Sequence, residues 1–198
     1  MLELRGLRRL QVGPVDLRVD VGTCVAIQGR SGTGKSVLLR MIADLDPHEG
    51  DAALDGQACS AIPAPAWRRQ VTYVAPDSGW WRERVAEHFA ADAGLDQLLP
   101  AVGIAAEAAG WPVARLSTGE RQRIALLRAL QSGNRVLLLD EPTSGLDRES
   151  ITRVEQLLRQ RLAAGTTILM VTHDAQQAVR MAHRRFDLDD GQLREQAG

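Results

Sequence analysis

A glycine-rich stretch, GRSGTGKS at residues 29–36, constrains this chain more than any other feature. The preceding residues 23–28 are mostly apolar and indicate a buried strand, and residues 36–45 carry leucine and isoleucine at helical spacing. Glycines let such a loop curl so that several backbone N–H groups point at one anion, and a helix N-terminus adds partial positive charge. A glycine-rich loop between a strand and a helix therefore predicts a phosphate-binding loop.

The only lysine of the chain, Lys35, lies in this stretch, although lysine and arginine together number 24. An ammonium group is compact and can reach between the β- and γ-phosphates of a nucleotide, whereas a guanidinium is larger and planar. The next residue, Ser36, would place its hydroxyl on Mg²⁺. The alternative is a glycine-rich turn that binds nothing, which the flanking strand and helix disfavour. We expect nucleotide contacts from Gly29, Arg30, Ser31, Gly32, Thr33, Gly34, Lys35, Ser36 and Val37.

A second candidate site follows the apolar run 136–139, which is typical of a central parallel strand. Asp140 and Glu141 come at its carboxyl end, where ligands bind in open α/β sheets. One carboxylate would hold Mg²⁺, and the other could polarise an attacking water. An acidic helix cap is the alternative, and it accounts for one carboxylate better than for two.

Two further segments carry candidate residues. Residues 116–120, LSTGE, begin an amphipathic pattern and indicate either a capped surface helix or a second phosphate-binding helix start. Residues 166–173 form another apolar strand that ends in His173. A lone histidine at a strand end is usually structural, but this one is expected at the same sheet edge as Gly29 and Asp140.

Taken in order, GRSGTGKS, LSTGE, VLLLDEPTSGLD and VTH resemble the motifs of the ATPase subunits of ATP-binding cassette (ABC) transporters. The resemblance covers nearly the whole chain and includes the turn at 46–56. It implies an α/β fold, with a P-loop core on a mostly parallel sheet, a small antiparallel N-terminal sheet and a trimmed helical subdomain. Residues 1–198 would form one domain, with the helical subdomain inserted at about 77–130.

The resemblance also implies roles for individual residues. Asp140 would be the Walker B carboxylate beside Mg²⁺, Glu141 the catalytic base and His173 a contact to the γ-phosphate. The family works as a head-to-tail dimer that ATP closes and hydrolysis opens. Contacts to ATP on the other protomer and to the dimer seam would come from Ser117, Thr118, Gly119, Glu120 and Asp147.

The sequence departs from the family pattern at several points. The signature is usually LSGGQ, and Val37 replaces the usual threonine. No aromatic residue precedes Trp67, so the usual ring that stacks on adenine is missing. The glutamine expected after the strand at 71–75 is also missing, because either Pro76 or Asp77 occupies its place.

Two adjacent tryptophans, Trp80 and Trp81, allow two interpretations. They could pack inside the helical subdomain, or they could form an exposed docking site for a membrane-spanning subunit. Between residues 82 and 115, the segments 85–94 and 95–103 are predicted helices.

Composition excludes some classes of partner and compartment. The net charge of −1 gives no broad basic face for nucleic acid, and no apolar run is long enough to cross a bilayer. The two cysteines, Cys24 and Cys59, are predicted to be small buried residues, in keeping with a reducing compartment. We therefore expect a cytoplasmic ATPase held on the inner face of the membrane by its transporter subunit. The rival functions are an ABC-type ATPase acting on DNA or ribosomes, and a nucleotide-gated binding module that hydrolyses poorly.

Overall fold

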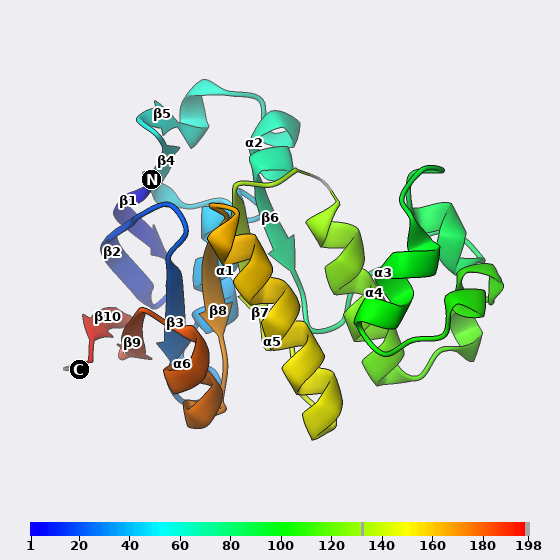
Figure 1. Ribbon diagram of the computed structural model, residues 1–198. Helices are drawn as coiled ribbons and strands as arrows, with labels where there is room; N and C mark the ends of the chain where they lie inside the picture. The colour runs from blue at the N-terminus through cyan, green and yellow to red at the C-terminus, as the bar shows by residue number, and fades with distance from the viewer. Residues whose placement is uncertain (132, 197–198) are drawn as a thin grey trace.

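The computed structural model describes residues 1–131 and 133–196, which form two β-sheets with helices packed against them (Figure 1). The six-stranded sheet has the order β10-β9-β3-β8-β7-β6, and the four-stranded sheet has the order β2-β1-β4-β5. The strands are β1 Leu2–Arg9, β2 Val12–Val19, β3 Cys24–Gln28, β4 Glu49–Leu54, β5 Gln57–Ala58, β6 Val71–Val74, β7 Val136–Asp140, β8 Thr167–Val171, β9 Arg184–Asp189 and β10 Gln192–Glu195.

Helices connect and cover these strands. The α-helices are α1 Lys35–Ile42, α2 Ala64–Gln70, α3 Leu95–Ala101, α4 Thr118–Leu130, α5 Arg148–Ala163 and α6 Ala175–Met181. Short 3₁₀ turns occur at Cys59–Ala61, Val85–His88, Ala106–Gly110 and Val113–Arg115. In the part of the chain that the structure describes, no helix is both long and apolar enough to cross a membrane.

The six-stranded sheet is buried on both faces, as the continuous apolar runs of its strands predict. On β7, Val136 and Leu138 pack with α1 and the four-stranded sheet, whereas Leu137 and Leu139 pack with α4, α5 and α6. Successive side chains of a strand point to opposite faces, so residues 136–139 contribute to the apolar cores on both sides of the sheet. Figure 1 shows α5 and α6 lying across one face of this sheet.

The strands from β9 to β6 pair in parallel, and only the β10 pairing with β9 is antiparallel among the pairings described in this sheet. The carboxyl ends of β3, β7 and β8 therefore meet at one edge. The four-stranded sheet is antiparallel throughout its described pairings. The predicted α/β class and both predicted sheets are confirmed.

The helical part of the chain differs from the sequence prediction in one segment. The predicted helix 95–103 is present as α3, but the predicted helix 85–94 is only the 3₁₀ turn Val85–His88. The turn ends at Phe89, whose backbone is extended at φ −123° and ψ 159°. The His88 ring folds back on the preceding segment, where its Nε2 accepts from the backbone N–H groups of Trp81 and Arg82. A separate apolar cluster, which includes Leu99 and Ile124, joins this region to α4.

Candidate functional site: a phosphate-binding pocket

The predicted phosphate loop lies between the end of β3 at Gln28 and the start of α1 at Lys35. Its glycines are required by its shape. Gly34 has φ +99°, and a Cβ there would lie 2.2 Å from Val12 Cγ2. Gly29 has φ +139°, and its Cβ would lie 2.4 Å from the Leu188 carbonyl oxygen. A side chain at either position would push the loop away from the strands that hold it.

Lys35 is held inside this loop. Its side chain is 6 % exposed, and its ammonium group donates to the carbonyl oxygens of Gly29 and Arg30, at 2.8 Å each. Burial lowers the pKa of Lys35, and the nearby charges of Glu141 and Asp140 oppose that shift. The lone lysine thus points into the loop where a phosphate would bind.

Asp140 ends β7 and is 3 % exposed. A buried carboxylate needs a donor, and the Tyr73 hydroxyl of β6 donates to Asp140 Oδ2 at 2.9 Å. Burial, with a further effect of the Asp140 charge, raises the pKa of Tyr73, so the phenol remains a hydrogen-bond donor at neutral pH. The neighbouring strand therefore fixes the carboxylate that the sequence predicts as a metal ligand.

Glu141 and His173 contact each other across the ends of β7 and β8, with His173 Nε2 2.7 Å from Glu141 Oε1. The backbone of Glu141 has φ +50°, a conformation that a non-glycine residue adopts at a cost. Three bonds hold it there: its N–H donates to Val171 O at 3.0 Å, and its carbonyl accepts from Gln122 Nε2 of α4 at 2.8 Å and from the Ser144 N–H at 3.1 Å.

These predicted residues share one pocket of about 250 Å³. It is lined by Gln11, Ser31, Gly32, Gly34, Lys35, Ser36, Val37, Asp140, Glu141 and His173. The structure thus brings together the loop, the acidic pair and the histidine from three separate parts of the sequence.

The predicted signature residues lie elsewhere. Among the described residues, none of Ser117, Thr118, Gly119, Glu120 or Asp147 lines this pocket. Ser117 caps α4, since its Oγ accepts from the Glu120 N–H at 3.2 Å, and the Glu120 carboxylate accepts from the Ser117 N–H at 2.8 Å. That backbone bond lowers the pKa of Glu120. The predicted capped helix start is confirmed, and its phosphate-binding role stays a prediction.

Asp147 begins α5 in a similar way. Its Oδ1 accepts from the Ser150 N–H at 2.9 Å and its Oδ2 from the Ser150 hydroxyl at 2.7 Å. The backbone bond from Ser150 lowers the pKa of Asp147, so the carboxylate is charged at neutral pH. Its position at a dimer seam stays a prediction.

The departures from the family pattern are visible in the structure. Pro76 and Asp77 are both exposed, and neither lines the phosphate pocket. Gln11, in the turn between β1 and β2, lies at the mouth of the pocket, and its amide donates to Gly32 O at 3.5 Å.

The two tryptophans differ from each other. Trp80 is half-buried against the cluster of α3 and α4, whereas Trp81 is 64 % exposed. Both rings meet the His88 ring edge to face, at centroid distances of 4.9 and 4.8 Å, and Arg128 lies over both. Trp80 thus packs inside the helical region, as one interpretation expects, whereas Trp81 is exposed and its docking role stays a prediction.

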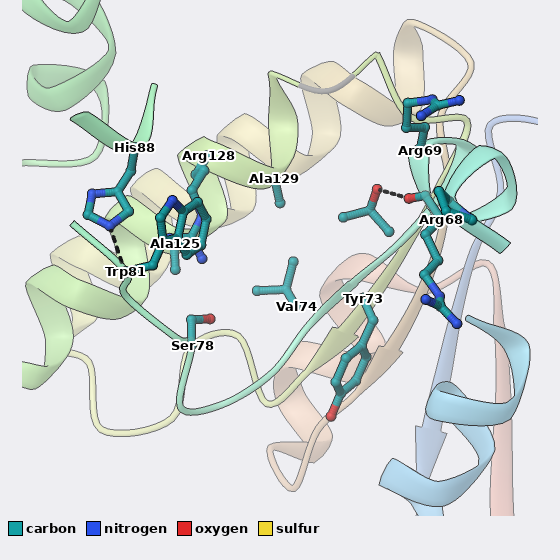
Figure 2. A pocket seen from close by; sticks show the side chains of 12 residues that line it. Arg68, Arg69, Tyr73, Val74, Ser78, Trp81, His88, Ala125, Arg128 and Ala129 are labelled. Atoms are coloured by element: carbon teal, nitrogen blue, oxygen red, sulfur yellow. Dashed lines mark hydrogen bonds between the residues drawn. The ribbon is translucent and has the colours of Figure 1, made fainter. Parts of the chain in front are cut away.

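Trp81 borders a second pocket of about 390 Å³ between α2, β6 and α4 (Figure 2). It is lined by Pro65, Arg68, Arg69, Thr72, Tyr73, Val74, Ser78, Trp81, His88, Ala125, Arg128 and Ala129. Three of these are arginines, and no carboxylate is among the lining residues that the structure describes.

Sequence reasoning missed four side chains around the phosphate pocket: Gln11, Tyr73, Gln122 and Gln177. None of the four belongs to a sequence motif. Gln11 lines the pocket, Tyr73 and Gln122 bond to Asp140 and Glu141, and Gln177 bonds to threonines beside Glu141 and His173. Only Tyr73 left a signal, because it is a polar aromatic residue near the carboxyl end of a predicted buried strand.

Together, the parallel sheet, the glycine loop with its buried lysine, and the carboxylates at the neighbouring strand end define a P-loop nucleotide-binding protein. The ABC transporter family model matches residues 12–144. The aliphatic sulfonates import ATP-binding protein SsuB of Pseudomonas entomophila is 42 % identical over 193 residues, covering 89 % of this chain and 67 % of the relative. An SsuB 2 protein of Pseudomonas aeruginosa is 39 % identical, covering 97 % of this chain and 73 % of the relative.

Solved structures agree with this assignment. The ATP-binding cassette MJ0796, in a dimeric post-hydrolysis state bound to ADP and Pi, has a TM-score of 0.86 at 25 % identity, covering 99 % of this chain and 98 % of that one. A bacterial Atm1-family ABC exporter with ATP bound shares the fold, with a TM-score of 0.87 at 24 % identity over 98 % of this chain and 38 % of that one. The chain belongs to the ABC transporter family, as an ATP-binding subunit that hydrolyses ATP to energise transport.

Proposed function

We propose that ATP binds with its phosphates in the pocket lined by loop residues 31, 32 and 34–37 and is hydrolysed there by Glu141; Gly29, Arg30 and Thr33 belong to the same loop but do not line this pocket. The observation that carries this proposal is the convergence of Lys35 with Asp140, Glu141 and His173 in one pocket. The Lys35 ammonium would bind the β- and γ-phosphates, and the backbone N–H groups of the loop would bind the remaining phosphate oxygens.

The residues of the pocket also fit Mg²⁺. The buried Asp140 carboxylate and the exposed Ser36 hydroxyl line the same pocket, and Mg²⁺ prefers oxygen ligands of this kind. We propose that these two residues hold the ion. When bound, Mg²⁺ would neutralise negative charge on the phosphate oxygens. Tyr73 leaves Asp140 Oδ1 without a bond to the phenol, and so open to such a ligand.

The contacts of Glu141 support a role as general base. In the resting structure one of its oxygens contacts His173, which leaves Oε2 to accept the proton of an attacking water. His173 is half exposed and lines the same pocket, so its Nε2–H can turn from Glu141 to a phosphate oxygen. Residues at the ends of two neighbouring strands would thereby orient the water and bind the developing charge.

The decisive test is Glu141→Gln, which keeps the shape of the side chain and removes the base. We expect unchanged ATP binding, a fall in kcat of about 10²–10⁴-fold, and an ATP-bound dimer that persists in light scattering. The matched control is Glu149→Gln, because Glu149 is 75 % exposed on α5 and should not affect turnover. Wild-type turnover in Glu141→Gln would overturn the proposal.

We also propose a head-to-tail dimer, in which each phosphate pocket receives the α4 N-terminus of the partner. Ser117, Thr118, Gly119 and Glu120 do not line their own pocket, and the partial positive charge of a helix N-terminus suits a phosphate. Asp147 would lie at the seam.

A mixing experiment tests this arrangement. Lys35→Ala disables the loop, and Gly119→Asp places a negative charge where the partner's phosphate would bind. Each variant alone should be inactive, but a mixture forms heterodimers with one intact site and should recover activity. A mixture of two Lys35→Ala preparations is the control. No recovery, despite heterodimer formation, would contradict the head-to-tail arrangement.

The pocket in Figure 2 is the proposed dock for the membrane-spanning subunit. It offers the exposed Trp81 ring with Arg128 over it, and Arg68 and Arg69 lie across the pocket (Figure 2), where Arg68 also pairs with Asp44; no described lining residue is acidic. Charge complementarity therefore favours a short partner segment that carries carboxylates and an apolar side chain. Docking there would hold the chain on the cytoplasmic face of the membrane.

Trp81→Ala tests this dock, because truncating an aromatic residue at an interface typically costs about 2 kcal/mol. We expect the chain to lose membrane association with its native partner subunit while its ATP binding persists. Trp111→Ala is the matched control, since Trp111 packs against Arg115 outside this pocket. Retained association would refute the dock.

The relatives at 39–42 % identity are import proteins, which supports transport into the cell.

A further inference from the structure

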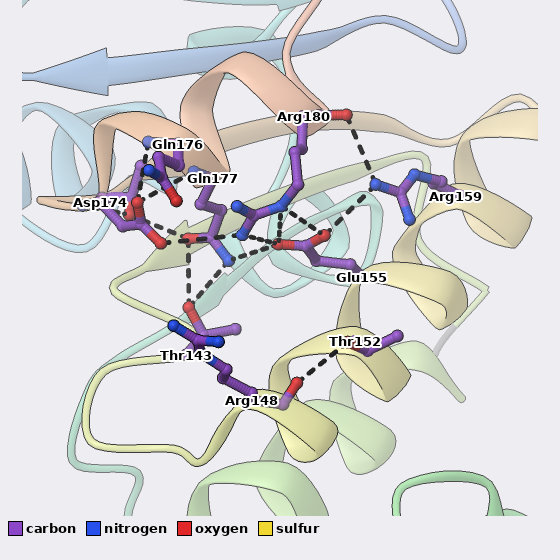
Figure 3. A network of polar contacts seen from close by, with 10 residues as sticks. Thr143, Arg148, Thr152, Glu155, Arg159, Asp174, Gln176, Gln177 and Arg180 are labelled. Carbon is purple, nitrogen blue, oxygen red and sulfur yellow. Dashed lines mark hydrogen bonds and ion pairs between the residues drawn. The ribbon is translucent and has the colours of Figure 1, made fainter.

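Gln177 is a fully buried polar side chain that no motif accounts for. It lies in the first turn of α6, four residues after His173. Figure 3 shows its amide at the centre of a network that joins α5, α6 and the segment after β7. A buried amide must have hydrogen-bond partners, so its contacts indicate what it holds in place.

The amide bonds to two threonines. The Thr172 hydroxyl donates to Gln177 Oε1 at 2.9 Å, and Gln177 Nε2 donates to Thr143 Oγ1 at 2.8 Å. Both threonines are themselves buried. One amide group therefore ties together the segments that follow β7 and β8.

Those two segments carry the residues proposed for hydrolysis. Thr143 is two residues after Glu141, and Thr172 directly precedes His173. Thr172 Oγ1 also accepts from the Asp174 N–H at 3.1 Å, which orders the turn that includes His173. Because Glu141 and His173 contact each other, any relative movement of these segments changes the geometry of the pair.

We infer that Gln177 is a positioning residue for hydrolysis, which fixes the position of the Glu141 segment relative to the His173 segment. The inference rests on the proposed hydrolysis by Glu141. Gln177 does not line the phosphate pocket, so it acts through the threonines and not on ATP. Its loss should therefore lower kcat and leave ATP affinity nearly unchanged.

The neutral amide is required by a neighbouring charge. Gln177 Nε2 lies 3.5 Å from Glu155 Oε1, and Arg180 binds the Glu155 carboxylate at 2.7 Å. Arg159 contacts the same carboxylate at 3.3 Å, and Asp174 lies 3.7 Å from Arg180. An amide can donate to Glu155 and accept from Thr172 at the same time, whereas a carboxylate cannot donate.

Gln177→Glu is the sharpest perturbation, because it changes the shape of the side chain very little. The new carboxylate would face Glu155 and could no longer donate to Glu155 or to Thr143, although it could still accept from the Thr143 hydroxyl, so kcat should fall by about tenfold or more. Burial and the Glu155 charge raise the pKa of a carboxyl placed here. Its protonated form can donate again, so the deficit relative to wild type should shrink as the pH falls from about 8 to about 6.

Two matched variants accompany it. Gln176→Glu makes the same change on the exposed neighbouring residue and should leave kcat as in wild type. The double variant Glu155→Gln with Gln177→Glu exchanges the charge and the amide, and it should recover kcat to within about threefold of wild type. Such a recovery would not occur if residue 177 merely filled space.

The assays are steady-state ATP turnover, fluorescent-nucleotide binding and thermal unfolding. If wild type turns over ATP and folded Gln177→Glu matches it at every pH, the inference is wrong and the proposed function stands. If wild type itself is inert, the proposed function fails. If Gln177→Glu does not fold, Thr172→Val decides, because it removes the hydroxyl link: a lower kcat at unchanged ATP affinity supports the inference, and an unchanged kcat overturns it.

Discussion

Lys35 offers a prediction whose size follows from the hydrogen bonds around it. An ammonium group has three N–H donors, and two of them bind the carbonyl oxygens of Gly29 and Arg30 at 2.8 Å. One donor therefore remains for a phosphate oxygen. A hydrogen bond of this charged kind contributes about 1.5–3 kcal/mol, which corresponds to roughly 10–150-fold in affinity.

Lys35→Ala removes that bond and the positive charge that opposes the phosphates, so we expect at least about 100-fold weaker ATP binding. It also removes two bonds inside the loop, so the variant should unfold at a lower temperature even without nucleotide. Lys35→Arg should bind weakly as well, because a planar guanidinium cannot meet two carbonyl oxygens and a phosphate from one compact centre.

A fluorescent-nucleotide titration measures the affinity, and thermal unfolding with and without ATP measures the stabilisation by ligand. Ligand bound only to the folded state stabilises it by RT ln(1 + [L]/Kd), so the rise in Tm with ATP should nearly vanish in Lys35→Ala. An unchanged Kd in a folded Lys35→Ala protein would refute the assignment of this loop as the phosphate site.

Three shorter predictions follow. Gln11→Trp places a ring at the mouth of the pocket and should tighten ATP binding by about 1–2 kcal/mol, since aromatic stacking on a base contributes about 1–3 kcal/mol; a titration with no gain would contradict this. Tyr73→Phe leaves the buried Asp140 carboxylate without its phenol donor, so the free energy of unfolding should fall by about 1–3 kcal/mol and the Mg²⁺ dependence of turnover should change. Ser117→Ala removes the cap of α4 and should cost about 1 kcal/mol in denaturant unfolding, with ATP binding by the monomer unaffected and ATP-driven dimerisation weakened.

The parts of the site that the sequence predicts are those set by local chain geometry. A strand, a glycine loop and a helix in succession form one unit, and the positive φ values of Gly29 and Gly34 confirm why glycine occupies these positions. The ends of parallel strands must share an edge, so the meeting of Asp140 with His173 also follows from the strand pattern. The helix predicted at 85–94 is wrong because the chain becomes extended at Phe89, while the His88 ring bonds to the preceding residues 81 and 82, contacts that no periodicity reveals.

The unpredicted parts depend on contacts between distant segments. Adjacent in sequence, Trp80 and Trp81 differ in exposure because only Trp80 faces the cluster around α3 and α4. Gln176 and Gln177 are likewise adjacent and identical in type, yet Gln177 is buried and Gln176 is exposed. Only the packing of α6 against its neighbours distinguishes the two side chains. A motif names the residues that touch the nucleotide, whereas the residues that hold those groups in place are selected by three-dimensional neighbours. Buried polar side chains with complete hydrogen-bond partners are therefore where a structure adds most to a motif-based assignment.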